Sequence, residues 1–260
     1  MCQGIVCSHS CCNHQKNPIE TWKASTVGTY ALLEIARNNK ATLLQASTSE
    51  IYGDPLVHPQ AEGYWGNVNT IGLRSCYDEG KRAAEALVYD YRRVHGLNAK
   101  IVRIFNTYGP YMHPNDGRAI SNFVNAALKN EVIEIYGDGS ASRSFCYVDD
   151  LVEGLITAMG TNFDVPINLG TNLEITITEL AEIIIRITGS ESQIRFLAAK
   201  PDDPIKRQPD LSRAKNILNW TPNVTLNSGL KTTIEYFKKY VVANTVHDSV
   251  SIISEGITNE

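Results

Sequence analysis

Apolar residues follow two patterns along the chain: helical spacing, which predicts helices, and short continuous runs, which predict buried strands. Residues 17–39 carry apolar side chains at roughly helical intervals behind an Asn-Pro start, which predicts a helix. Residues 41–47 (ATLLQAS) form a short apolar run typical of a buried strand. A second helix is predicted over residues 75–95 with Gly96 as its stop, and residues 100–105 (KIVRIF) predict the next strand. The order strand, helix, strand favours a parallel sheet.

From residue 118 onward the predicted elements are shorter and less regular. Helices are predicted at 120–129, 148–159, 177–188 and 227–242, and strands at 132–136, 144–147 and 167–169. Residues 244–260 lack a clear period, and we expect them to form a loose tail.

Composition and charge exclude several classes of protein. With 260 residues, 43% of them apolar, the chain can bury a sizeable core. A net charge of -4 gives no basic footprint for nucleic acid. No apolar run reaches the length of a membrane span, and the first residues do not resemble a signal peptide. A cytoplasmic location is therefore the expectation.

Four of the six cysteines lie within the first twelve residues, at positions 2, 7, 11 and 12. With His9 and His14 they suggest a metal cluster, but their spacing matches no paired Cys-x-x-Cys framework. We expect no metal site and no structural disulfide. Cys76 and Cys146 fall inside predicted elements and are interpreted as small buried apolar residues.

Polar residues follow the first two predicted strands at their carboxyl ends. Thr48, Ser49 and Glu50 follow the first strand, and Asn106 follows the second. In open α/β sheets ligands bind at this edge. The long loop over residues 54–74 lies between them, and loops of this length in compact domains are usually functional.

Tyr77 and Lys81 lie four residues apart in the second predicted helix, so both side chains project from one face. A free phenol, with a pKa of ~10, is a poor base at neutral pH, but a fixed ammonium nearby favours the phenolate. The same spacing is common on solvated helix faces. Spacing alone therefore leaves a surface pair as the alternative.

Taken together, these stretches resemble the extended short-chain dehydrogenase/reductases, which form the NAD-dependent epimerase/dehydratase family. The resemblance covers about residues 17–240. It rests on ASTSEIYG (46–53), Tyr77-x-x-x-Lys81, RIFNTYGP (103–110), RSFCYVDD (143–150), NLG (168–170) and DDPIKRQPD (202–210).

The resemblance implies an α/β fold: a Rossmann-like parallel sheet, here without its N-terminal strands, and a smaller α/β substrate lobe. Residues 1–117 would be the C-terminal part of the NAD-binding Rossmann domain. Residues 118–243 would form mostly the nucleotide-sugar lobe, with segments that return to the first domain, and residues 244–260 the tail.

Within the family, the chain is similar to the UDP-glucuronate decarboxylases, which make UDP-xylose. This likeness rests on YGDPLVHPQ (52–60), YWGNVN (64–69), RSCYDEGKR (74–82) and NDGR (115–118). The alternative is a dTDP-glucose 4,6-dehydratase or another nucleotide-sugar epimerase or dehydratase. Dehydratases carry Asp-Glu after the Thr, because dehydration needs paired carboxyl groups; this chain has Ser49-Glu50. A departure from the decarboxylases is Tyr111, where they have Arg.

The resemblance also implies roles for individual residues. Tyr77, Lys81, Thr48 and Glu50 would be catalytic. Tyr77 takes the proton of the sugar 4-hydroxyl while hydride passes from C4 to NAD, and Thr48 bonds the 4-oxygen. Tyr77, Lys81 and Ser47 would contact the cofactor. The substrate would be held by Asn106, Arg118, Tyr136, Arg143 and Arg207, since guanidinium groups suit a diphosphate.

The front of the family pattern is missing. A Gly-x-x-Gly-x-x-Gly turn, whose following helix binds the pyrophosphate of NAD, has no counterpart in the 260 residues. We expect impaired NAD binding and activity, and read the chain as an N-terminally truncated form of a longer enzyme. A short product that has lost cofactor affinity and a complete enzyme with other cofactor contacts are the alternatives.

Two classes of function follow. One is a UDP-sugar enzyme that needs the missing half, and the other is a non-catalytic protein that binds a nucleotide sugar or a partner. Neither a nucleic acid nor a membrane is expected as a partner. The resemblance implies a homodimer through the Tyr77 helix. The apolar positions Ala83, Leu87 and Tyr91 fit this role and equally fit an ordinary core.

Overall fold

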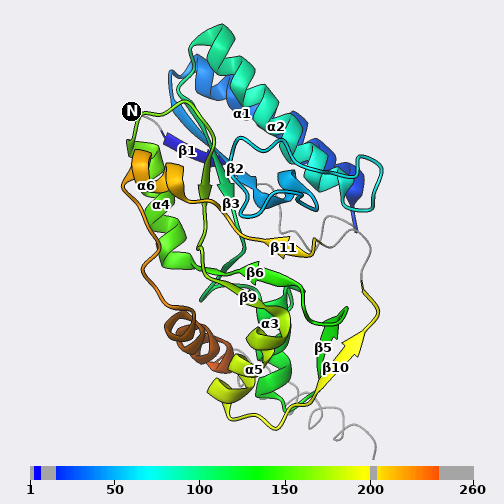
Figure 1. The fold of residues 1–260 in the computed structure, drawn as a ribbon. Coiled ribbons are helices and arrows are strands. Elements are labelled where there is room, and N and C mark those ends of the chain that lie inside the picture. Colours follow the sequence, from blue (N-terminus) through cyan, green and yellow to red (C-terminus); the bar gives the residue numbers. More distant parts are fainter. Residues whose placement is uncertain (1–2, 7–15, 200–203, 240–260) are drawn as a thin grey trace, which may run out of the picture.

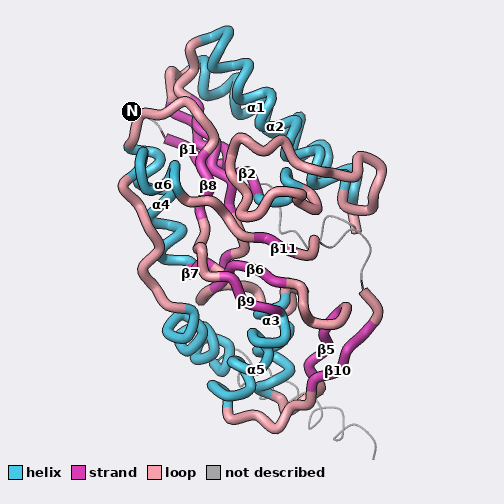
Figure 2. The backbone as a smooth tube through the Cα atoms, viewed as in Figure 1, coloured by secondary structure: helices cyan, strands magenta, loops and turns pink. Residues whose placement is uncertain are grey.

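The computed structural model describes residues 3–6, 16–199 and 204–239. Within these residues the chain forms two α/β parts, one above the other in Figure 1. The upper part contains a four-stranded sheet with helices on both faces, and the lower part contains helices and a two-stranded sheet. Short strands lie between the two parts (Figure 2). The predicted α/β class, with a Rossmann-like parallel sheet and a smaller lobe, is confirmed.

The large sheet is parallel throughout, in the order β1-β2-β3-β8. Its strands are β1 (Gln3–Val6), β2 (Thr42–Thr48), β3 (Ala99–Ile104) and β8 (Ile167–Leu169). All seven residues of β2 are buried, as expected for a strand that is covered on both faces.

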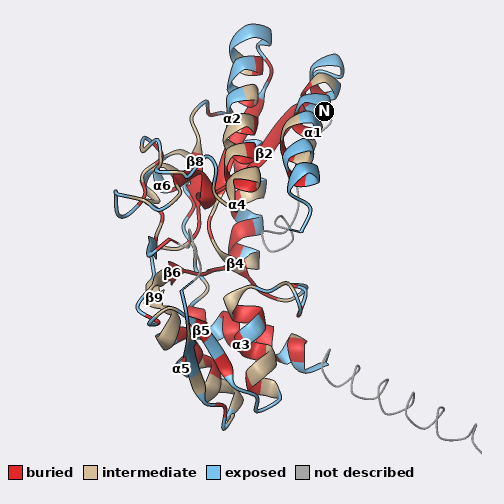
Figure 3. Cartoon of the chain, turned by 90° about the vertical axis from the view of Figure 1, so that its right-hand side faces the viewer, coloured by how far each residue is buried: buried red, intermediate tan, exposed pale blue. Residues whose placement is uncertain are grey.

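Successive side chains of the sheet enter two different cores. Leu43 and Ile101 pack in a core with residues of α1 (Pro18–Asn38) and α2 (Ser75–His95). Their neighbours Leu44 and Val102 pack on the opposite face, against α4 (Val148–Gly160) and α6 (Ser212–Leu218). Figure 3 shows the resulting pattern, with buried inner faces on α1 and α2 and exposed outer faces.

The lower part is built around a third core. It contains α3 (Ala119–Leu128), α5 (Ile177–Thr188) and a helix at residues 226–239. Strands β5 (Ile133–Tyr136) and β10 (Ile194–Leu197) pair in parallel beside them. A capping box at Thr176 and Glu179 fixes the start of α5, and Gly189, at φ 67°, ends it.

The two parts are joined by short strands near the carboxyl end of the large sheet. Strands β11 (Lys206–Arg207), β6 (Ser142–Ser144) and β9 (Glu174–Thr176) form one small sheet, and β4 (Thr107–Tyr108) pairs with β7 (Cys146–Tyr147). Residues that are distant in the sequence thus meet beside the ends of β2 and β3.

Most predicted elements are confirmed. The helix predicted over 17–39 is α1, the strand over 41–47 is β2 with a shift of one residue, and α2 ends at Gly96 as predicted. Strand β1 is not among the predicted elements. Four residues are too few to show a period, and β1 is recognised only by its pairing with β2.

Several sequence predictions lie outside the described residues. They concern the four N-terminal cysteines and the tail at 244–260. Of the other two cysteines, Cys146 is buried and Cys76 is half-buried. In the described ranges no helix is long and apolar enough to cross a membrane, and no group of metal-ligating side chains is found. The domain boundary at 117/118 stays a prediction.

Candidate active site

The carboxyl end of β2 carries the first group of predicted site residues. A short 3-10 helix, η1 (Ser49–Tyr52), follows the strand directly, and Thr48 caps it by accepting a hydrogen bond from the Glu50 amide. This turn buries Thr48 and Glu50 at the sheet edge. Asn106 lies at the end of the neighbouring strand β3.

Helix α2 places Tyr77 and Lys81 beside this edge. Both residues are buried, and the Lys81 Nζ lies 5.7 Å from the centre of the Tyr77 ring. The ammonium donates a 2.8 Å hydrogen bond to the Ala46 carbonyl of β2. A lysine fixed in this way between helix and strand is a built feature of the core, so the solvated surface pair is excluded.

Ser47 points to a different group of residues. Its hydroxyl donates to Glu85 of α2, and Glu85 in turn accepts from Arg103 of β3. A contact of Ser47 with a cofactor stays a prediction.

Glu50 is the centre of an ionic cluster. Arg207 of β11 donates from both terminal nitrogens to its two oxygens, and Arg74 lies 2.6 Å from Oε2. Burial by itself would raise the pKa of Glu50, but the charges of Arg207 and Arg74 outweigh it and hold this pKa well below its usual range. Glu50 is therefore a carboxylate throughout the neutral range.

Asp78 is the residue of this cluster that the sequence did not reveal. Its carboxyl group is buried, and Arg74 Nε lies 3.9 Å from Oδ2. Burial and the negative charge of Glu50 raise the pKa of Asp78 to about 7. Arg74, the link between the two carboxyl groups, was also not predicted: both residues lie in the RSCYDEGKR stretch (74–82), but the resemblance assigned roles there only to Tyr77 and Lys81.

A cavity of about 360 Å³ extends from Glu50 toward the lower part of the chain. Its walls include all five residues predicted to bind the substrate: Asn106, Arg118, Tyr136, Arg143 and Arg207. Four guanidinium groups line it, those of Arg74, Arg118, Arg143 and Arg207, against the two carboxylates of Glu50 and Glu134. The structure thus joins residues up to 157 positions apart in one cationic cleft suited to a diphosphate.

Individual residues differ in how firmly this cleft holds them. Arg143 is buried, and its Nη1 donates to the carbonyls of Ser142 and Ile205. Arg118 is half-exposed and paired with Asp116. Tyr136 ends β5 with nearly half of its surface accessible, so its ring can meet a planar base.

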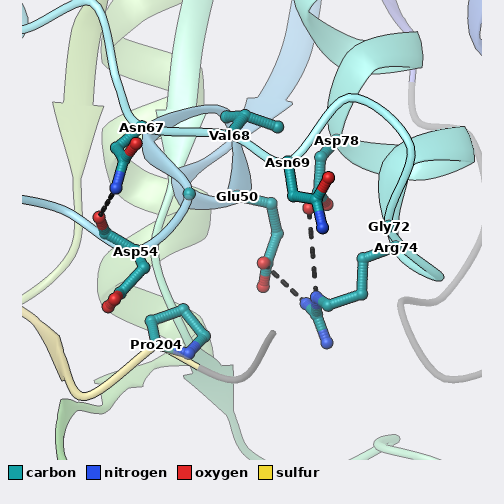
Figure 4. A pocket seen from close by; sticks show the side chains of 10 residues that line it. Glu50, Asp54, Asn67, Val68, Asn69, Gly72, Arg74, Asp78 and Pro204 are labelled. Atoms are coloured by element: carbon teal, nitrogen blue, oxygen red, sulfur yellow. Dashed lines mark hydrogen bonds and ion pairs between the residues drawn. The ribbon is translucent and has the colours of Figure 1, made fainter. Parts of the chain in front are cut away.

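A second cavity, of about 230 Å³, adjoins the first at Glu50 and Arg74. Figure 4 shows both side chains in it together with Asp78, Asn69 and Asp54. Because Glu50 and Arg74 line both cavities, the two cavities meet at these side chains.

Known proteins are similar to this chain in sequence and in fold. The model of the NAD dependent epimerase/dehydratase family matches residues 8–170. The chain belongs to this family. NAD is the cofactor of the family, and the resemblance inferred from the motifs is confirmed.

Relatives in the family narrow the comparison. UDP-glucuronic acid decarboxylase 1 of Xenopus tropicalis is 50% identical over 227 residues, which are 87% of this chain and 54% of that protein. UDP-glucuronic acid decarboxylase 3 of Arabidopsis thaliana is 48% identical over 234 residues, 90% of this chain and 68% of that protein. The chain thus spans between about half and two thirds of these relatives' length.

A solved family structure matches the fold. The UDP-glucuronic acid 4-epimerase of Bacillus cereus, in complex with UDP-glucuronic acid and NAD, matches with a TM-score of 0.81 and 25% identity. The match covers 89% of this chain and 73% of that one. The chain is thus an enzyme-family member with the architecture of a nucleotide-sugar epimerase or dehydratase.

Proposed function

We propose that this chain is the substrate-binding and base-bearing part of a UDP-glucuronate decarboxylase, which converts UDP-glucuronate to UDP-xylose by transient oxidation at C4. The observation that carries the proposal is the cavity in which all five predicted substrate residues meet beside Glu50. The relatives that are about 50% identical to this chain over the matched residues are decarboxylases by name.

The state of Glu50 supports decarboxylation over dehydration. A dehydratase must protonate a departing hydroxyl group, and this needs a carboxyl group that still holds its proton. Two guanidinium groups keep Glu50 ionised, and its neighbour Ser49 has no carboxyl group. Asp78, whose pKa is raised, lines the smaller cavity and is not among the residues that line the substrate cavity. A 4-keto-uronate is a β-keto acid and loses carbon dioxide without such an acid.

Each side chain of the site has a separate role in the proposed reaction. Tyr77 accepts the proton of the 4-hydroxyl and later returns it, while the fixed ammonium of Lys81 stabilises its phenolate. Thr48 would hydrogen-bond the 4-oxygen. The arginines would hold the diphosphate, and Tyr136 would lie against the uracil. NAD, when bound, supplies the hydride acceptor for C4.

The residues present fit the nicotinamide side of NAD better than its diphosphate side. A buried ammonium beside a phenol suits a ribose hydroxyl, so Lys81 and Tyr77 would hold that half. The glycine-rich turn is absent from the 260 residues. Strand β1 lies at the end of the sheet order, where further parallel strands of a family N-terminal half would pair. The chain alone is therefore proposed to bind NAD weakly.

The proposal predicts that a family-type N-terminal half, fused to residue 1, gives UDP-xylose from UDP-glucuronate. In this fused protein Tyr77→Phe removes the base and reduces turnover by a factor of about 10² or more. Tyr89→Phe, an exposed position on the same helix, is the matched control. Wild-type turnover in Tyr77→Phe would overturn the assignment of the base. A fused protein that binds UDP-sugars without turnover would favour the non-catalytic alternative.

A homodimer through α1 and α2 is part of the proposal. Helix α1 exposes Ile19, Trp22 and Val27, an apolar surface that a second copy would cover. Tyr91 packs inside the protomer instead, where its hydroxyl donates to Glu34 of α1. Light scattering of a Val27→Glu variant tests the dimer, which this charge should dissociate. A cytoplasmic location also stays a prediction.

A further inference from the structure

Decarboxylation of a uronate, the proposed function on which this inference rests, consumes one proton in each turnover. The bond between C5 and the carboxylate carbon breaks, carbon dioxide leaves, and the electron pair stays on C5 as an enolate. C5 then takes a proton. The proton that Tyr77 accepts from the 4-hydroxyl goes back to the 4-oxygen, so it cannot balance this step. A separate donor must draw the proton from solvent.

Glu50 is buried and lines the substrate cavity, but it is a poor donor. Both of its oxygens accept hydrogen bonds from Arg207, and Arg74 contacts Oε2 as well. Protonation would break these charge-assisted contacts.

Asp78 has the opposite environment. Its Oδ1 is buried and has no hydrogen-bond partner among the described residues, and its Oδ2 lies 3.9 Å from Nε of Arg74. An ionised oxygen without a partner is costly inside a protein. The negative charges of Glu50 and Glu79 disfavour ionisation further, against the opposing charges of Arg74 and Arg207, so that the pKa of Asp78 is about 7.

The smaller cavity connects this carboxyl group to the others. Six of its ten lining residues carry polar side chains, which are Glu50, Asp54, Asn67, Asn69, Arg74 and Asp78. A space of about 230 Å³ holds several water molecules, since one water occupies ~30 Å³ in the liquid. Asp54 is exposed, so the cavity reaches from solvent to Asp78. Figure 4 shows Arg74 between Asp78 and Glu50, and Arg74 and Glu50 are the two residues that also line the substrate cavity.

We propose that Asp78 and this polar cavity form the proton supply of the site. Protonated Asp78 gives its proton, through water in the cavity, to the C5 enolate in the substrate cavity, which meets the smaller cavity at Glu50 and Arg74, and takes a new proton from solvent through the same water. Electrons and charge balance, because one proton enters from solvent for each carbon dioxide that leaves. Asp78 thus supplies the proton through water and does not itself contact the substrate.

The first test uses the 260-residue chain and does not depend on activity. In a sample labelled with ¹³C at the Asp carboxyl groups, NMR titration should show one buried carboxyl group that titrates about three pH units above an ordinary Asp of pKa ~3.9. This signal should disappear in Asp78→Asn and remain in Asp90→Asn, a control at an exposed position of the same helix. A signal of Asp78 that titrates near 4 would overturn the proposal.

The second test uses the fused protein described above. Asp78→Asn should lower kcat roughly 10- to 100-fold with KM for UDP-glucuronate changed less than twofold. It should raise the solvent deuterium isotope effect and remove the fall in kcat that the wild type shows as pH rises through about 7. Asp90→Asn should change none of these.

The outcomes separate the two proposals. Wild-type kcat and an unchanged pH profile in Asp78→Asn would overturn the proton supply and leave the proposed function intact. If the fused wild-type protein makes no UDP-xylose, the proposed function fails and the proton supply fails with it.

Discussion

Two largely buried arginine–glutamate clusters lie near the carboxyl end of the large sheet, and they differ in how completely they are paired. In the first, Arg103 donates to both oxygens of Glu85, to the Tyr52 hydroxyl and to the Glu62 carbonyl. Ser47 completes the pairing of Glu85. In the second, Glu50 binds two guanidinium groups, and Asp78 keeps a carboxyl oxygen without a partner among the described residues.

This difference in pairing indicates that the Arg103–Glu85 cluster is structural and that the Glu50 cluster is part of the candidate site. The Arg103–Glu85 cluster joins β3 to α2, and it lines neither of the cavities that border Glu50. Its contacts raise the pKa of Arg103 further, although burial alone would lower it. The Glu50 cluster lines two cavities and contains a carboxyl group that titrates near neutrality. Incomplete pairing of buried charges beside a cavity is typical of a functional site.

The largest effect on stability is expected at the Arg103–Glu85 cluster. Glu85→Gln leaves the buried charge of Arg103 without its counter-charge, which should lower the free energy of unfolding by about 3–5 kcal/mol. Urea unfolding followed by circular dichroism measures the loss. The exposed Glu153 of α4 is the control, and Glu153→Gln should change the same quantity by less than ~0.5 kcal/mol. Equal effects of the two substitutions would contradict a structural role for Glu85.

A smaller loss of stability is expected at the Glu50 cluster. Glu50→Gln should cost about 1–3 kcal/mol, because water in the two cavities can solvate Arg74 and Arg207. Because the pKa of Glu50 is held below its usual value, its ionisation stabilises the fold fully above pH 4.5. This stabilisation is lost as pH falls from 4.5 to the folded-state pKa of about 2. The difference from the wild type should therefore shrink below pH 4.5.

The same variant sharpens the comparison at Asp78. Without the negative charge of Glu50, and with two guanidinium groups left nearby, the pKa of Asp78 should fall from about 7. Carboxyl NMR of Glu50→Gln measures it. An unchanged titration of Asp78 would show that the two carboxyl groups do not interact.

The smallest effect has the opposite sign. A raised pKa makes the stability contribution of Asp78 complete below its ordinary value of 3.8, and this contribution is lost as pH rises to about 7. Asp78→Asn avoids this loss, so its melting temperature should exceed that of the wild type above pH 7, by about 2–4 °C for each kcal/mol recovered. Near pH 4 the two proteins should melt together. If Asp78→Asn were less stable than the wild type at pH 8, this would contradict the view that the buried charge of Asp78 destabilises the fold.

Much of this fold can be read from the sequence, because β2 is a continuous apolar run, α1 begins at an Asn-Pro pair and α2 ends at Gly96. Strands such as β11, which has two residues, exist through tertiary pairing and have no period. Motifs identified Glu50 and Arg207 as separate site residues, but not the pair they form across 157 positions. Asp78 could not be predicted, since its unusual state depends on burial and on Glu50, neither of which local sequence contains.

The central claim is that the 260-residue chain contains a nucleotide-sugar site, and calorimetric titration with UDP-glucuronate tests it most directly. We predict binding at one site, weakened at high salt and by at least about tenfold in Arg143→Lys, which keeps the charge but loses the fork of donors. Arg195→Lys, an exposed position on β10, should bind like the wild type. NAD should bind weakly or not at all. No binding of UDP-glucuronate would contradict the claim, and micromolar binding of NAD would contradict the cofactor part of the proposal.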